Sequence, residues 1–455
     1  MFSQLTENKS IYQTLWRLAL PIMISNISLP LLGLVDTAIL GHLDDNRYLA
    51  AVAMGASLLV FVLWSFAFLR MGTTALVAQH LGAQHLSRQS VSGQPQPQNS
   101  SHSPFSDMAI LHCAIFLAFI IGAVLILCSP LLIEVMLTLV SAVDGVTPLT
   151  REYLQTRFLV SPITLINYAL LGYFIGHGKT KISLILFVST NILNGILDYV
   201  FVYSFHLNSQ GVAWASNLSE CFQLVLAIYF ARDRIFNYQP FHELKKYLAS
   251  FISLNFHLFV RTFFLLFTFA FFMSKGAQHS AALLSANAIL FNLLMFISNG
   301  LDGFALASES MVGKAMGAKD KIKVKQVVLA SGVLSFATAL LFTIILAIGH
   351  EEILALLTSQ EPVLALLDQL EYWLIFLPLA GFACYWLDGV YIGLGAGKEM
   401  RNSLLFAVFI LFLPLQFLLQ SWPMHGLWLA FYGFLIGRAF WQLMKLPANI
   451  NKSVN

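Results

Sequence analysis

The sequence predicts an all-α integral membrane protein with twelve transmembrane helices in two six-helix lobes. Three observations predict it: an apolar composition, twelve long apolar segments, and motifs that recur in the same order in both halves. Of the 455 residues, 58% are hydrophobic and 10% are charged, whereas a soluble protein carries about a quarter charged residues. This composition excludes a cytosolic enzyme, a disordered protein and a nucleic-acid binder, and it indicates that lipid surrounds most of the chain.

Each predicted span is long enough to cross the hydrocarbon layer, which takes about 20 apolar residues in a helix. The segments lack the alternation of apolar and polar residues that marks transmembrane β-strands, so helices are expected. Polar residues, Gly or Pro delimit the twelve segments, which are 14–40, 48–79, 107–139, 151–177, 181–204, 211–231, 250–274, 281–314, 325–349, 367–395, 402–421 and 427–446.

Lys and Arg lie mostly on one side of this topology. Nineteen of the 25 fall on the side of both termini, three fall on the opposite side, and three lie within spans. The positive-inside rule therefore predicts a multi-pass protein of the bacterial inner-membrane type with both termini in the cytoplasm. The three arginines within spans are long enough to extend to the interface, and we expect that of Arg70, Arg157 and Arg261.

Three motifs of the first half recur in the second half. Because six spans return the chain to the same side, the halves form a parallel repeat about an axis along the membrane normal, as in secondary transporters. We expect an N-lobe at 1–231, a cytoplasmic linker at 232–249 and a C-lobe at 250–455. The matched strings are AQHLGAQ (78–84) with GKAMGAK (313–319), GYFIGHG (172–178) with GVYIGLG (389–395), and GVAWA (211–215) with GLWLA (426–430).

Four polar residues of the first half are the candidate coupling site. A carboxylate within the hydrocarbon costs about 2.5 kcal/mol or more, so it needs a reason to be there. Asp36, Asp198 and Ser216 fall at similar depths below the outer surface, and Asn194 lies one turn before Asp198 on the same helical face. Burial and the proximity of a second carboxyl both disfavour ionisation, so the pair can take up and release a proton. The same oxygens could instead bind Na⁺, or serve only in hydrogen bonds and a wet vestibule.

Other intramembrane groups have two interpretations each. Asp302 and Asp388 of the second half either pair with Lys or Arg or act directly. Asn167 lines a cavity or makes an interhelical hydrogen bond. Pro21 favours a bend in the first span that protonation could bias, or a permanent kink.

Enzymatic motifs are missing from the sequence. There is no H-E-x-x-H or G-x-S-x-G, and the string at 173–180 lacks the first glycine of a P-loop. The four cysteines lie in apolar segments without metal-site spacing. We therefore expect that the protein is not an enzyme and that it binds no metal and no cofactor.

The segment 20–43 (LPIMISNISLPLLGLVDTAILGHL), followed by LAAVA at 49–53, resembles the opening of the multidrug and toxic compound extrusion (MATE) family. The nearest branch is the DNA-damage-inducible F (DinF) type. The resemblance extends over all twelve spans. It implies two six-helix lobes around a cavity that opens alternately to each side, and export of cationic or amphipathic organic compounds in exchange for H⁺ or Na⁺.

The resemblance also implies roles for single residues. The first-span aspartate and the fifth-span N-x-x-x-D motif of the family bind the coupling ion, and a hydroxyl of the sixth span belongs to the same site. A fourth-span tyrosine lines the pocket, a first-span proline is associated with bending, and other branches place key acids in the second lobe. The matching positions are Asp36, Asn194, Asp198, Ser216, Tyr153, Pro21 and, for the second lobe, Asp388.

The leading hypothesis is a proton-coupled antiporter in which protonation of Asp36 and Asp198 is coupled to bending of the first span. The expected partners are the bilayer and small organic cations or amphipathic drugs, with no nucleic acid, and the expected state is a monomer. Two alternatives stay open: Na⁺-coupled antiport by the same site, and a lipid-linked precursor flippase. A flippase needs several cationic groups to hold pyrophosphate, and only three arginines lie within the spans.

Overall fold

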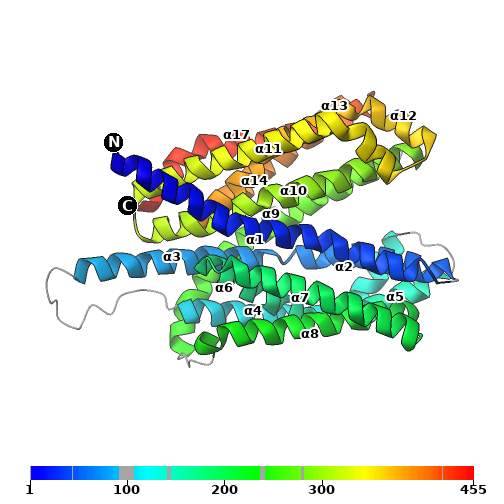
Figure 1. Cartoon of the computed structure of the whole chain (residues 1–455), viewed down its shortest axis with the longest axis horizontal. Coiled ribbons are helices and arrows are strands. Elements are labelled where there is room, and N and C mark those ends of the chain that lie inside the picture. Colours follow the sequence, from blue (N-terminus) through cyan, green and yellow to red (C-terminus); the bar gives the residue numbers. More distant parts are fainter. Residues whose placement is uncertain are drawn as a thin grey trace. The chain divides into compact units, whose positions relative to one another are not determined.

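The computed structural model describes residues 2–43, 45–91, 107–140, 145–235, 241–277, 281–422 and 424–454 (Figure 1). All regular structure in these ranges is helical. The helices are α1 (Phe2–Leu40), α2 (Asn46–Trp64), α3 (Phe68–Val91), α4 (Asp107–Leu139), α5 (Val146–Phe158), α6 (Ser161–His177), α7 (Thr180–Tyr199), the π-helical turn η1 (Val200–Ser204), α8 (Asn208–Ile235), α9 (Phe241–Ala277), α10 (Ala281–Gly317), α11 (Lys321–Leu357), α12 (Glu361–Gln369), α13 (Glu371–Ile375), α14 (Leu377–Gly393), α15 (Gly397–Phe406), the π-helical turn η2 (Ala407–Phe412), α16 (Leu413–Leu418) and α17 (His425–Val454).

Within the described ranges, 10 helical segments are long and apolar enough to cross a membrane. Helices α5 and α6 meet the same test together as one span that is bent by 53°. Helix α1, with 39 residues, is a further long helix. These elements correspond one to one with the twelve predicted spans, and the all-α membrane fold class is confirmed.

The chain forms two compact units, and each is described by itself. The first unit comprises Ile24–Val77 and Ser103–Ser253; the second comprises Met1–Met23, Ala78–His102 and Leu254–Asn455. In the first unit α4 packs on α6, α7 on α8, and α2 on α5 (Figure 1). In the second unit α14 packs on α10, α11 and α17. The predicted lobe boundaries stay a prediction, and residues 236–240 of the predicted linker lie outside the described ranges.

The internal repeat is visible in glycine contacts that occur in both units. A Cβ on Gly172 of α6 would lie 2.4 Å from the carbonyl oxygen of Arg70 on α3. In the second unit, a Cβ on Gly389 of α14 would lie 2.1 Å from the carbonyl oxygen of Ala305 on α10. Only glycine permits such close backbone approach. The two contacts involve matched positions of the repeat.

The two glycine-rich strings also end in the same way. Gly178 and Gly395 both adopt left-handed backbone angles, with φ of 76° and 68°. The backbone N–H of the residue that follows each glycine donates to the carbonyl oxygen five residues earlier, at 2.8 Å after Gly178 and 3.0 Å after Gly395. This arrangement is the glycine cap that satisfies the free carbonyl groups at a helix end. The sequence motif therefore specifies one local structure, used twice.

A reciprocal contact joins the ends of α3 and α10 within the second unit. A Cβ on Gly82 would lie 1.9 Å from the carbonyl oxygen of Lys314, and a Cβ on Gly317 would lie 1.7 Å from that of Gln79. Gln79 and Lys314 each precede the glycine of their own helix by three residues. Gly82 thus contacts Lys314, and its counterpart Gly317 contacts Gln79, which is the counterpart of Lys314. A two-fold relation between the repeats produces this pattern.

This contact makes a testable prediction. The Gly317→Val variant should lower the free energy of unfolding by about 1–3 kcal/mol or more, because the added side chain cannot share space with the Gln79 carbonyl. Thermal unfolding of the detergent-purified protein, followed by fluorescence-detected gel filtration, measures the loss. Gly33→Ala is the matched control, since a Cβ there meets nothing within 4 Å. An unchanged midpoint for Gly317→Val would contradict the packing.

Candidate functional site

The two predicted aspartates lie together in the first unit. Asp198 on α7 is fully buried and Asp36 on α1 is half-buried. Their carboxyl groups are within hydrogen-bond reach of each other. Two carboxyl groups can form a hydrogen bond only when one of them carries a proton. The Oδ1 atom of each carboxyl is buried and has no donor among the described residues, so the pair has free capacity for a proton or a small cation.

Asn194 and Ser216 complete a cluster of four predicted residues. Asn194 on α7 is buried and donates from its amide to Asp198 Oδ2 at 3.2 Å. Its amide oxygen accepts the backbone N–H of Ser216 on α8 at 3.1 Å. Helix α7 changes to the π-helical turn η1 two residues after Asp198, and such turns are frequent at functional sites. The structure therefore brings Asp36, Asp198, Asn194 and Ser216 to one place.

Tyr153 and Asn167, the predicted cavity residues, occupy different positions near this cluster. Tyr153 on α5 is buried against Gly55 of α2 and close enough to both aspartates for electrostatic interaction. Asn167 on α6 is buried and donates to the backbone oxygen of Glu220 on α8 at 3.0 Å. Asn167 also lines a cavity of about 200 Å³.

Sequence reasoning missed an ion pair beside the cluster. Arg157 at the end of α5 lies 2.7 Å from Oε1 of Glu220 and donates to Oδ1 of Asn217 at 2.7 Å. Thr164 donates to the other carboxylate oxygen of Glu220. The sequence does contain a sign of this pair. Glu220 is an ionisable residue within a span, and it lies four positions after Ser216, on the same face of α8.

The expectation that Arg157 extends to the membrane interface was wrong. Its side chain is only 10% exposed, and that of Glu220 is 18% exposed. A buried guanidinium is retained inside when a carboxylate and further hydrogen bonds satisfy it. The break between α5 and α6 supplies part of the reason for this arrangement, since Asn217 also donates to the Thr156 carbonyl at 2.7 Å. Broken helices in membranes need such replacement donors.

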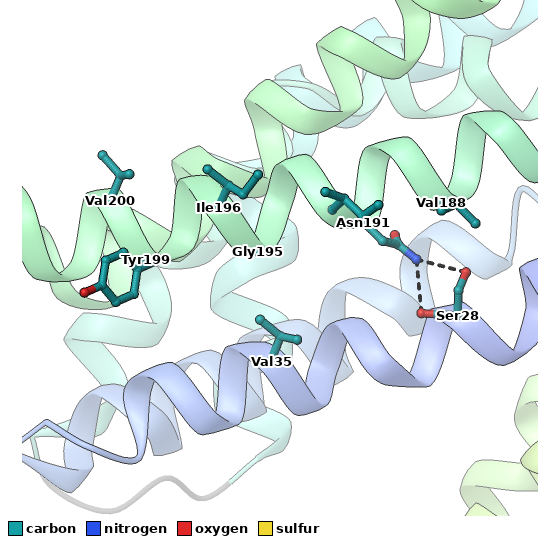
Figure 2. Close-up of a pocket in the computed structure, with 9 residues that line it drawn as sticks. Ser28, Val35, Val188, Asn191, Gly195, Ile196, Tyr199 and Val200 are labelled. Carbon is teal, nitrogen blue, oxygen red and sulfur yellow. Dashed lines mark hydrogen bonds between the residues drawn. The ribbon is translucent and has the colours of Figure 1, made fainter.

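A larger cavity, open to the outside of the unit, lies between α1 and α7 (Figure 2). Its volume is about 580 Å³, within the range of cavities that bind drug-sized ligands. Figure 2 shows Asn191 reaching from α7 to Ser28 on α1, where it donates to the backbone and hydroxyl oxygens at 3.0 Å. The other lining residues are mostly apolar: Val35, Val188, Ile192, Gly195, Ile196, Tyr199 and Val200.

Asp388, the main second-half candidate, is held by two arginines. Arg261 donates to its Oδ2 atom, Arg438 does the same at 2.5 Å, and Gln442 donates to Oδ1 at 2.9 Å. Arg261 is buried, so the expectation that it extends to the interface was also wrong. Of the two interpretations offered for Asp388, these contacts favour pairing with arginine.

Asp302 and Pro21 do not belong to the aspartate cluster as the structure describes it. Asp302 on α10 is half-buried and close enough to Cys384 for electrostatic interaction. Pro21 is buried within the continuous helix α1, fifteen residues before Asp36. In the described chain no group of three or more His, Cys, Asp or Glu side chains could hold a metal ion.

The pairing of Asp388 with two arginines predicts that this carboxylate stabilises the folded protein. Asp388→Asn should lower the free energy of unfolding by about 3–5 kcal/mol, because it leaves two buried guanidinium groups without their carboxylate. The measurement is the thermal midpoint and the yield of monodisperse protein.

Asp45→Asn is the control for this substitution. Asp45 lies outside the spans, 2.6 Å from Arg47, and that hydrogen bond lowers the pKa of the carboxyl below its usual value. The Asp45 carboxylate therefore stays ionised at ordinary pH and is protonated only in stronger acid than a free aspartate needs, while Arg47 stays charged. Because the pair is exposed, its loss should leave stability unchanged. Equal effects of the two substitutions would contradict the structural role of Asp388.

These features define a multi-pass, all-helical membrane protein with a buried polar site in its first unit. The chain belongs to the MatE family, whose sequence profile matches residues 21–94, 108–200 and 256–418. Its members are transporters, and this protein is accordingly a transporter and not an enzyme.

Relatives agree with this assignment, and solved structures share the fold. DNA damage-inducible protein F of Escherichia coli is 36% identical over 429 residues, covering 93% of this chain and 89% of the relative. A probable multidrug resistance protein NorM of Bacillus cereus is 25% identical over 437 residues, covering 92% and 91%. An outward-facing multidrug resistance MATE transporter of the MOP superfamily superposes with a TM-score of 0.82, at 18% identity and with 97% and 96% coverage. A mutant of the Vibrio cholerae MATE transporter VcmN gives the same TM-score and identity, with 98% coverage of both chains.

Proposed function

We propose that this protein is a proton-coupled exporter of cationic and amphipathic organic compounds. The observation that carries the proposal is the contact between the Asp36 and Asp198 carboxyl groups. A carboxyl pair in this position holds a negative charge that an organic cation and a proton can compete for. Protonation removes that charge and releases the cation.

The proposed exchange has a defined order. The ionised pair binds an organic cation from the cytoplasmic side, and protons arriving from outside displace it. The protons then leave toward the cytoplasm, where their concentration is lower. Each charge that moves down the membrane potential contributes about 2.3 kcal/mol per 100 mV. We further propose that loss of the charge on Asp36 alters the bending of α1, with Pro21 as the hinge.

The cavity between α1 and α7 supports an amphipathic substrate. It offers a mostly apolar surface of drug-binding size on α1 and α7, the two helices that carry the aspartates. A cation with an aromatic or aliphatic body could lay its apolar part along Val35, Ile192 and Ile196, of which Val35 directly precedes Asp36 in α1. The relatives whose names include multidrug resistance agree with a broad substrate range.

Na⁺ coupling by the same site is the second candidate. The site contains two carboxylates, an amide and a hydroxyl, which are the oxygen ligands that hard cations prefer. The lipid-linked precursor flippase has less support. Of the three arginines expected within the spans, Arg157 and Arg261 are each paired with a carboxylate. Arg438, which the count of Lys and Arg assigned to the side of the termini, is buried and also paired with a carboxylate. A pyrophosphate site needs free cationic groups.

The proposed location is the inner membrane of a bacterial cell, with both termini in the cytoplasm and the protein acting as a monomer. The excess of Lys and Arg in loops on the side of the termini supports this orientation. The relationship to the Escherichia coli protein supports a bacterial inner membrane.

A substitution at the pair tests the proposal. Asp36→Asn should abolish ion-driven uptake of ethidium into everted vesicles, which corresponds to export from the cell, with the amount of protein in the membrane unchanged. The reason is that an amide cannot exchange a proton at this position. Glu134→Gln is the control, since Glu134 is exposed and, among the described residues, pairs with Arg151 at 3.0 Å. Undiminished efflux by Asp36→Asn would exclude Asp36 from coupling.

The coupling ion has its own test. In proteoliposomes, a pH gradient alone should drive ethidium export, whereas a Na⁺ gradient at uniform pH should not. Empty liposomes and the Asp36→Asn variant give the background. Export driven by Na⁺ and not by protons would replace the proposed ion with Na⁺ while retaining the site.

A further inference from the structure

The Arg157–Glu220 pair lies beside the aspartate cluster and has no assigned part in the exchange. Asn217, which accepts from Arg157, follows Ser216 directly in α8, and Ser216 contacts Asn194. The guanidinium is close enough to Asp36 and Asp198 to act on both carboxyl groups electrostatically. It nevertheless contacts Glu220 and Asn217, each at 2.7 Å.

A single unopposed guanidinium here would interfere with ion exchange. In a protein interior of effective dielectric near 20, unit charges several Å apart interact by kcal/mol amounts. Arg157 alone would stabilise the ionised aspartates and would compete, as a tethered cation, with any ion that they bind. Glu220 supplies the opposing charge, and Thr164 fixes one of its oxygens.

We propose that Glu220 is a positioning residue that holds and neutralises Arg157, and so sets the affinity of the Asp36–Asp198 pair for its coupling ion. The pair acts as an internal counter-charge and does not itself carry substrate. This inference rests on the proposed function of the aspartate pair.

Other charged or titratable groups face the same region. Tyr153 contacts Arg157 from one turn earlier in α5. Tyr168 on α6 is near Glu220, and Arg70 on α3 is near Tyr168. All of these groups are unchanged in the variants below, so they contribute equally to each measurement.

The test compares four proteins in proteoliposomes: wild type, Glu220→Gln, Arg157→Gln and the double variant. The measured quantity is the concentration of coupling ion that gives half the maximal initial rate of ethidium export. Glu220→Gln should raise this concentration about tenfold, because the released positive charge opposes binding of a cation. Arg157→Gln should lower it, because Glu220 then adds an unopposed negative charge. The double variant should return close to the wild type, and Glu220→Asp, which keeps the charge, should resemble the wild type.

Opposite shifts of the half-maximal ion concentration in the two single variants distinguish this role from a purely structural support of the break between α5 and α6. A purely structural pair would lower the amount of folded protein in both single variants and leave the half-maximal concentration unchanged, which would overturn the inference. If Glu220→Gln is not recovered in the membrane, the other two variants test the inference. It then requires a lowered half-maximal concentration in Arg157→Gln and a value close to wild type in the double variant, and an unchanged value in Arg157→Gln would overturn it. Ethidium export by Asp36→Asn at the wild-type rate would instead refute the proposed function itself.

Discussion

Burial of charge in a medium without water is the constraint on which the site depends. A carboxylate or guanidinium inside the spans is tolerated only with a partner. The structure meets this constraint in different ways. Asp388 lies against two guanidinium groups and an amide. Asp198 lies against another carboxyl and an amide. In the first arrangement the Asp388 carboxylate has its partners without an added ion, whereas the second becomes satisfied when a proton or cation is present.

This difference explains why the proposed chemistry belongs to the first unit. A group that is fully paired has little reason to exchange its partner, and Asp388 is such a group. The aspartate pair has unused acceptor capacity, since the Oδ1 atom of each carboxyl lacks a donor within the described chain. The π-helical turn that begins two residues after Asp198 adds local irregularity, and the two helices that carry the pair, α1 and α7, also line an apolar cavity. Because the chain belongs to a transporter family, we connect this exchangeable charge with transport.

Glycine has a separate part in the architecture. At Gly172, Gly389, Gly82 and Gly317 the backbones of neighbouring helices approach so closely that no side chain fits. Without a hydrophobic driving force between helices in lipid, this kind of contact is a main source of helix association. The same contacts occur at matched positions of the two halves, so the repeat in the sequence is a repeat of packing and not only of composition.

The sequence by itself determined the number of spans, the internal repeat and four members of the candidate site. These features depend on local rules: the length needed to cross a bilayer, the helical spacing that places Asn194 beside Asp198, and the rarity of carboxylates in apolar segments. Only the tertiary structure decided which charges pair. Arg157 and Arg261 have long, flexible side chains that either extend to the interface or turn inward, and the choice depends on carboxylates from other helices. Glu220 and Asp388 are those partners, 63 and 127 residues away in sequence, and no local pattern connects residues so far apart.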